Sequence, residues 1–368
     1  MKTFDSTKIN YILRVPTDKD KDVISQLLGG IGTDRLDLEN YTERLAFGLY
    51  RIRKLFEEHP HVVTQFDWGA DQISFYKAAD AACTTVFNSY KLALAGRREE
   101  ALALLYSYYF SKGLIEHFIE DVPKDTKFYR LRPSDDYRLY SKEEMFHLPF
   151  EKCHKTSNYR FSISGLPILY FGSSMYGCWL EANQPDIEKA NVALYQINSE
   201  SSVKCFPLIM PQRRDKVTNE RIKLLPLILA STMKVQQPKE PFRPEYVIPQ
   251  LLTECVQKYN AEQKPDYILG IKYLSTKRYS EGNYFSGERY TYLYENYTFP
   301  PIEHSFYGVC PQLSECFLLI RSSSVFQDTH VRPQRELLKD KKEPRDEYQK
   351  STFRKLERWL ATPQMLTY

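Results

Sequence analysis

Long apolar runs are missing from this 368-residue chain, and so are the glycine-rich loops of the common nucleotide-binding folds. No segment approaches the roughly 20 apolar residues that a membrane-spanning helix needs. The first residues lack the apolar core of a secretion signal, so we expect a cytoplasmic protein with no membrane partner. Neither Gly-x-Gly-x-x-Gly nor a Walker sequence occurs, so a bound dinucleotide would not be held in the Rossmann manner.

Cysteine content and net charge are also modest. The seven cysteines are odd in number and show no Cys-x-x-Cys spacing, which favours reduced thiols over a disulfide framework. His147, Cys153 and His154 lie near one another, but no second ligand pair accompanies them, so the sequence predicts no metal site. A net charge of +4 is too small to indicate a nucleic-acid partner, which would require a clustered basic face.

Tyrosine and phenylalanine are abundant, and the amino-terminal third arranges its apolar residues at helical spacing. The 28 Tyr and 21 Phe supply large amphipathic rings for the core, for interfaces and for ligand stacking. Helices are predicted at 37–59, 72–95, 98–110 and 114–119. We therefore assign residues 34–121 to an all-α domain that follows an unassigned segment, 1–33.

After residue 121 the pattern changes to short strands bounded by Pro and Gly. Strands are predicted at Lys127–Leu131, Ile168–Phe171, Val192–Ile197, Ile268–Tyr273, Tyr290–Tyr294 and Cys316–Arg321. Two helices are predicted among them, Val217–Met233 and Val247–Tyr259. Strands with inserted helices indicate an α+β domain over residues 122–325.

The final segment, 326–368, is dense in charged residues but keeps an apolar stripe at helical spacing. The stripe comprises Tyr348, Thr352, Leu356 and Trp359. We predict a surface helix that docks on the rest of the protein through this stripe.

The stretch from Arg160 to Glu181 carries the densest set of functional residue types. A Gly-Pro turn precedes the apolar run that holds Tyr170, which is typical of a buried strand. Ser173 or Ser174 can cap a following helix, and Glu181 would then lie about two turns into that helix. A cation, a phenol and a carboxylate would thereby converge on one turn.

This stretch resembles the RES-domain family, which is named for its Arg, Glu and Ser and is known chiefly for toxins of bacterial toxin–antitoxin pairs. The resemblance extends to Phe128–Leu131, which contains Arg130, and to Tyr267–Ser275, which resembles the strand that delivers the family's serine. Glu245–Leu252 resembles a segment of the longer RES proteins. Together these motifs cover roughly residues 120–325.

The resemblance implies an enzyme with an ADP-ribosyltransferase-like β-sandwich core, which consumes NAD as its substrate. In that interpretation Arg130 grips the pyrophosphate bidentately and Tyr170 stacks on the nicotinamide. Glu181 stabilises the cationic ribose that forms as nicotinamide leaves. Ser275 completes the catalytic set by holding the nicotinamide amide or the ribose. Further candidate contacts to phosphate or ribose are Arg160 and Asn283.

Other interpretations stay open. A non-catalytic regulatory protein could use a RES-like fold to bind NAD or a partner, since both ends are extended and Ser275 lies far from Glu181 in sequence. The helical region resembles the HEPN-like extensions of some RES proteins, and Arg53 to His59 resembles the HEPN ribonuclease motif. Because His59 precedes Pro60 at a helix end, we favour a structural role for it. An antitoxin or the amino-terminal domain could silence the site, and a homo-oligomer is compatible with the sequence.

Overall fold

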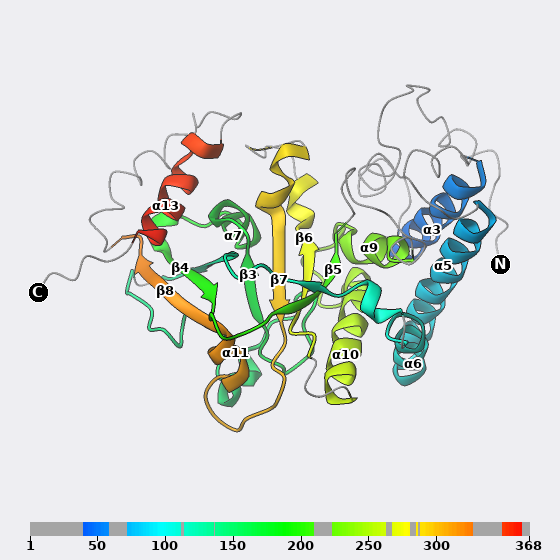
Figure 1. Cartoon of the computed structure of the whole chain (residues 1–368), viewed down its shortest axis with the longest axis horizontal. Helices are drawn as coiled ribbons and strands as arrows, with labels where there is room; N and C mark the ends of the chain where they lie inside the picture. Colours follow the sequence, from blue (N-terminus) through cyan, green and yellow to red (C-terminus); the bar gives the residue numbers. More distant parts are fainter. Residues whose placement is uncertain are drawn as a thin grey trace, which may run out of the picture.

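The structure is a computed structural model that describes residues 40–58, 72–111, 114–135, 137–209, 223–262, 267–279, 285, 288–326 and 348–362. Helices and one large sheet share these residues, which confirms the predicted α+β class. In Figure 1 the amino-terminal helices stand on one side of the sheet, and the carboxy-terminal helix lies on the opposite side. Within the described ranges, no helix is long and apolar enough to cross a membrane.

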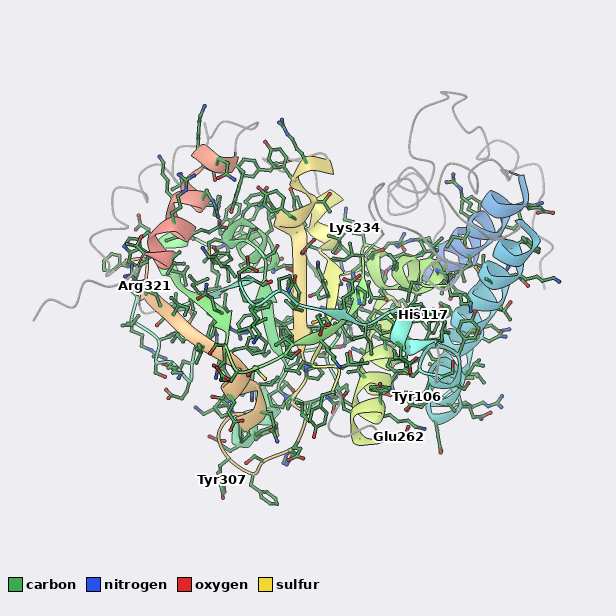
Figure 2. All side chains as sticks on the ribbon, viewed as in Figure 1. Tyr106, His117, Lys234, Glu262, Tyr307 and Arg321 are labelled. Atoms are coloured by element: carbon green, nitrogen blue, oxygen red, sulfur yellow. The ribbon has the colours of Figure 1, made fainter. Side chains whose placement is uncertain are left out.

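The apolar stripes of the amino-terminal third form the predicted helices α3 (Tyr41–Glu58), α5 (Gln72–Leu94) and α6 (Arg98–Tyr109). They pack on α9 (Leu225–Thr232) and α10 (Val247–Glu262), which lie between them and the sheet (Figure 1). Where α6 meets α10, the Tyr106 hydroxyl donates to the Glu262 carboxylate (Figure 2). One hydrophobic cluster runs from α3 to the sheet. The amino-terminal helices therefore share their core with the following region, and the boundary at residue 121 stays a prediction.

Eight strands of the described residues form one sheet in the order β1-β5-β6-β7-β3-β2-β4-β8. Their bounds are β1 Glu120–Asp121, β2 Lys127–Pro133, β3 Leu169–Gly172, β4 Ala190–Ile197, β5 Lys204–Leu208, β6 Gly270–Leu274, β7 Glu295–Phe299 and β8 Phe317–Ser324. Strands β5 and β6 are parallel, and the other neighbouring strands are antiparallel. Because hydrogen bonds join all eight strands into a single sheet, the ADP-ribosyltransferase-like β-sandwich stays a prediction.

Two predicted elements are wrong. The predicted strand Tyr290–Tyr294 lies in a 3₁₀ segment, η6 (Glu288–Tyr294), and the strand β7 follows it. Tyr290 and Leu293 are both buried three residues apart, which is the repeat of a 3₁₀ helix rather than of a strand. The predicted helix 114–119 is only a single 3₁₀ turn, η1 (Ile115–His117). The start of the predicted helix Val217–Met233 falls outside the described residues, and α9 covers the later part.

The carboxy-terminal helix α13 (Thr352–Ala361) docks as its apolar stripe predicts. Tyr348, Thr352 and Leu356 are buried, and Trp359 is half-buried against the same cluster. The helix packs on β8, where Arg321 Nη1 donates to the Trp359 carbonyl at 2.8 Å, and on α7 (Met175–Glu181) (Figure 1). The charged tail of the sequence thus contributes directly to the core around α7.

Candidate active site

A cleft of about 820 Å³ opens beside the centre of the sheet, where β2, β3, β6 and α7 meet loops 155–168 and 234–246. This volume lies in the range of small-molecule and cofactor sites. Four of the residues that the sequence singles out line it: Arg130, Arg160, Tyr170 and Glu181. Positions far apart in the chain therefore share one cavity.

A local divergence of β2 from β3 opens one wall of the cleft. The two strands pair only where Tyr129 faces Gly172. The Tyr170 carbonyl, which a longer ladder would pair with β2, instead accepts a hydrogen bond from Arg130 Nη1 at 2.8 Å. Burial lowers the pKa of Arg130 to about 10, which leaves the guanidinium charged at neutral pH. Its Nε is buried and has no partner among the described residues. The two strands thus separate around the Arg130 guanidinium, whose Nε makes no hydrogen bond to the described residues.

Tyr170 lies on β3, and its ring makes an edge contact with the Tyr159 ring, with centroids 5.7 Å apart. Its hydroxyl is buried, and so is that of Thr298, the residue paired with it on β7. Neither hydroxyl makes a hydrogen bond of normal geometry in the described structure. Burial raises the pKa of Tyr170, so the phenol stays protonated at neutral pH and available as a donor.

Glu181 ends the short helix α7 and is solvent-exposed at the mouth of the cleft. The helix begins as the sequence predicts, because the Ser174 Oγ accepts from the Gly177 N–H at 2.9 Å. The Ser174 hydroxyl also donates to the Leu293 carbonyl at 2.7 Å. At the other end, the Glu181 carboxylate accepts from Asn296 Nδ2 at 2.8 Å. The carboxylate is therefore oriented by β7, a strand more than 100 residues away in the chain.

Two glycines let α7 lie close to its neighbours. A Cβ at Gly172 would lie 2.7 Å from Cys178 Sγ, and one at Gly177 would lie 2.5 Å from the Leu293 carbonyl oxygen. A thiol can rotate away, whereas a backbone carbonyl held by Ser174 cannot. Gly177 therefore determines how closely the helix approaches the segment that leads into β7.

We expect Gly177→Ala to destabilise the protein by about 2 kcal/mol, because the added methyl group must push α7 away from Leu293. The free energy of unfolding in urea measures this loss. Gly165→Ala is the matched control: that glycine has φ +80° and open space around it, so only its backbone conformation is penalised, by about 1 kcal/mol. An equal or smaller loss for Gly177→Ala would contradict the close packing of α7.

Ser275 is the predicted catalytic residue that does not line the cleft. It is 1% exposed, and its Oγ accepts a hydrogen bond from the Lys277 N–H at 3.1 Å. Lys277 itself lines the cleft and donates from Nζ to Asn183 Oδ1 at 2.9 Å. The serine therefore shapes the turn that presents a lysine. Asn283, the other candidate contact, lies outside the described residues.

The cleft is strongly basic. Seven cationic side chains line it: Arg130, Arg132, Lys155, Arg160, Lys234, Arg243 and Lys277. Among the described residues of the lining, Glu181 alone carries a carboxylate. The four arginines donate to backbone carbonyl groups, and no carboxylate in the described part of the chain forms an ion pair with them. Since carbonyl groups are neutral, the positive charge remains available for an anionic ligand.

Several lining residues have no signal in the sequence that assigns them to a site. They include Tyr159, Arg243, Tyr246, Tyr273 and Asn296. Arg243 follows a polar, proline-containing loop without a recognisable motif, and Tyr246 lies in the segment that resembles the longer RES proteins but has no role assigned by that resemblance. Asn296 lies just beyond the misplaced strand at Tyr290–Tyr294, so its side-chain direction could not be inferred. Arg132 was visible two residues after Arg130, but this spacing is equally typical of a solvated strand face.

Of the residues considered as metal ligands or as a ribonuclease motif, His147 and Arg53 have other partners in the structure. His147 is fully buried, and its Nδ1 donates to the Leu148 carbonyl while Nε2 accepts from the Cys310 N–H, each at 2.8 Å. Both ring nitrogens are thereby occupied. No group of three or more His, Cys, Asp or Glu in the described ranges could hold a metal ion. Arg53 pairs with Asp80 at 2.6 Å, and His59 lies outside the described residues.

Burial lowers the pKa of His147 to about 4, from about 6.5 in an unfolded chain. Below pH 6.5 the unfolded chain binds a proton that the folded protein does not, so stability falls as the pH drops toward 4. Between pH 7.5 and 5 we expect His147 to cost about 2 kcal/mol of unfolding free energy. Urea titrations should show that wild type loses this free energy of unfolding between the two pH values and that His147→Gln does not, because glutamine can accept from the Cys310 N–H without titrating.

Comparison with known proteins shows that the chain is similar to a curated protein. The chain is 33% identical over 219 residues to "Putative toxin YopC" of Bacillus subtilis (strain 168). The match covers 55% of this chain and 47% of that protein, so the chain spans about half the length of this curated relative. No protein-family model matches the chain. No solved structure matches it either, so the ADP-ribosyltransferase-like core rests on the sequence resemblance.

Proposed function

We propose that this protein is a toxin that cleaves the nicotinamide–ribose bond of NAD. One observation carries the proposal: a basic cleft contains a single described carboxylate, Glu181, together with Arg130 and Tyr170. The excess of cationic side chains favours binding of a pyrophosphate, and the tyrosine rings favour stacking on a flat ring. The relative whose name includes "toxin" supports the biological role.

In the proposed reaction the side chains act mainly by placing charge beside the ribose and the pyrophosphate, and less by transferring protons. As the bond between ribose C1′ and the nicotinamide nitrogen breaks, its electron pair moves to the ring nitrogen, which loses its positive charge. The ribose becomes an oxocarbenium-like cation, which the Glu181 carboxylate stabilises. A water oxygen then bonds to C1′ and releases a proton, giving ADP-ribose and nicotinamide. Arg130 holds the pyrophosphate with the donors that its bond to the Tyr170 carbonyl leaves free.

The roles of Ser275 and of the amino-terminal helices differ in this proposal from those that the sequence resemblance implies. Ser275 acts on the turn that presents Lys277 rather than on the dinucleotide, because it is buried behind that turn. Inhibition is assigned to a separate antitoxin that covers the cleft. No residue of α3, α5 or α6 lines the cleft, so the described part of the amino-terminal region offers no side chain to occlude it.

The direct test is nicotinamide release. Purified protein is incubated with NAD, and free nicotinamide and ADP-ribose are separated chromatographically against a no-protein blank. Equimolar appearance of both products supports hydrolysis, and nicotinamide without free ADP-ribose indicates transfer to another acceptor. Expression in a bacterial host should lower cellular NAD before growth stops. Growth arrest with unchanged NAD would contradict the proposal.

A non-catalytic role in binding NAD is the alternative, and one observation favours it. Ser275 does not line the cleft, so the predicted catalytic set is incomplete around the cavity. Titration calorimetry separates the two functions. Saturable NAD binding with no nicotinamide release over many hours would establish the binding protein and exclude the enzyme.

A further inference from the structure

A pair of arginines forms a second cationic group in the cleft, on its loop side. The guanidinium carbons of Arg160 and Arg243 lie 5.2 and 5.4 Å from the ring centroid of Tyr246. Each guanidinium is fixed by two backbone carbonyls. The acceptors are Ser231 and Met233 for the first arginine, and Asn158 and Pro238 for the second. Two like charges are thus held on one aromatic ring by neutral partners.

Neither guanidinium of this pair has an ionic partner among the described residues. No carboxylate in the described residues forms an ion pair with either arginine, and two like charges on one ring repel each other. The Arg243 Nε is buried and has no partner among those residues. Lys155 and Lys234 also line the cleft, as does Tyr273 of β6. The arginine pair therefore resembles a prepared anion site more than a support for the loop.

The charge of NAD does not account for this second group. The pyrophosphate carries two negative charges, which Arg130 and Arg132 on β2 can already balance. A phosphate monoester adds about two more charges at neutral pH. In other dinucleotide sites an arginine accommodates such a phosphate on the 2′-hydroxyl of the adenosine ribose.

We propose that Arg160 and Arg243 bind a 2′-phosphate on the adenosine ribose, so that the preferred dinucleotide is NADP rather than NAD. A preference for NADP in turnover rests on the proposed function, whereas a preference for NADP in binding does not. In either case the arginine pair would bind a phosphate group in addition to the pyrophosphate of the dinucleotide. A free inorganic phosphate that occupies the arginine pair is the competing source.

Titration calorimetry of the full chain with NADP and with NAD tests the binding. Glu181→Gln is used so that neither ligand is consumed. We expect NADP to bind at least roughly tenfold more tightly, because two charge-assisted contacts are added. Arg243→Gln should reduce this ratio several-fold. Lys239→Gln is the matched control, since it removes a charge from the same loop at an exposed position that does not line the cleft.

Each outcome decides the inference. Equal affinities, or tighter binding of NAD, would overturn it even if both dinucleotides lose nicotinamide. A preference for NADP without any nicotinamide release would uphold it and refute the proposed enzyme. If Arg243→Gln fails to fold, Arg243→Lys takes its place. Lysine keeps the charge but not the pair of hydrogen bonds to backbone carbonyls, and the ratio of its affinities for NADP and NAD is then the quantity compared. Inorganic phosphate that raises NAD affinity or turnover, with no NADP preference, would assign the site to free phosphate and overturn the 2′-phosphate.

Discussion

Replacing Glu181 with glutamine is expected to lower the rate of nicotinamide release from NAD by roughly 100- to 1,000-fold. Glutamine keeps the size of the side chain and can still accept a hydrogen bond from Asn296, so the loss isolates the negative charge. The effect should appear in kcat, because the carboxylate acts on a ribose that becomes cationic only in the transition state. Affinity for NAD should stay the same or improve, since a negative charge leaves the neighbourhood of an anionic ligand.

The control for this variant is Glu315→Gln, an exposed change on α11 (Pro311–Cys316) that does not line the cleft. It should retain wild-type turnover. Because Glu181 is itself exposed, its replacement should change the free energy of unfolding by no more than about 0.5 kcal/mol. Equal kcat values for wild type and Glu181→Gln would remove the carboxylate from the mechanism. A large loss of stability would mean that reduced activity reports unfolding instead.

The parts of the site that follow from local sequence are those that the sequence predicts correctly. The apolar run after the Gly-Pro turn predicts β3 with Tyr170, and a serine cap gives the start of α7 and hence the position of Glu181. These features depend on spacing within about ten residues. Arg130 also lines the cleft, although the reason is not local: β2 and β3 diverge after one pair of residues.

What the sequence does not predict depends on contacts between distant segments. Asn296 orients Glu181 across 115 positions, and the hydrogen bond exists only because β7 pairs with β3. Arg160 and Arg243 meet over Tyr246 for a similar reason, since loop 234–246 folds back onto residues 158–160. Ser275 also depends on a distant segment, since its N–H donates to the Tyr294 carbonyl at 2.8 Å. A strand-end serine next to a loop looks accessible in sequence, and only the tertiary fold decides where its hydroxyl points.

The carboxy-terminal helix provides the second large expected effect. Glu357 is 2% exposed, and its carboxylate accepts from the Met175 N–H at 2.8 Å and from Arg354 Nη1 at 3.0 Å. The Tyr348 hydroxyl donates to the same carboxylate. Met175 is the first residue of α7, so Glu357 caps the helix that ends at Glu181. The interaction joins the tail of the chain to the proposed catalytic carboxylate.

Glu357→Ala should therefore lower the free energy of unfolding by about 3 kcal/mol, because it leaves buried donors without an acceptor. Nicotinamide release should also fall at temperatures where the variant is still folded, since α7 loses its anchor at Met175. Glu357→Gln is the informative partner variant. Burial raises the pKa of Glu357, which means that a neutral side chain is tolerated better there than at an exposed carboxylate. We expect glutamine, which can still accept from Met175, to recover most of the activity and part of the stability. If alanine lowers stability but leaves kcat unchanged, the tail supports the fold without positioning Glu181.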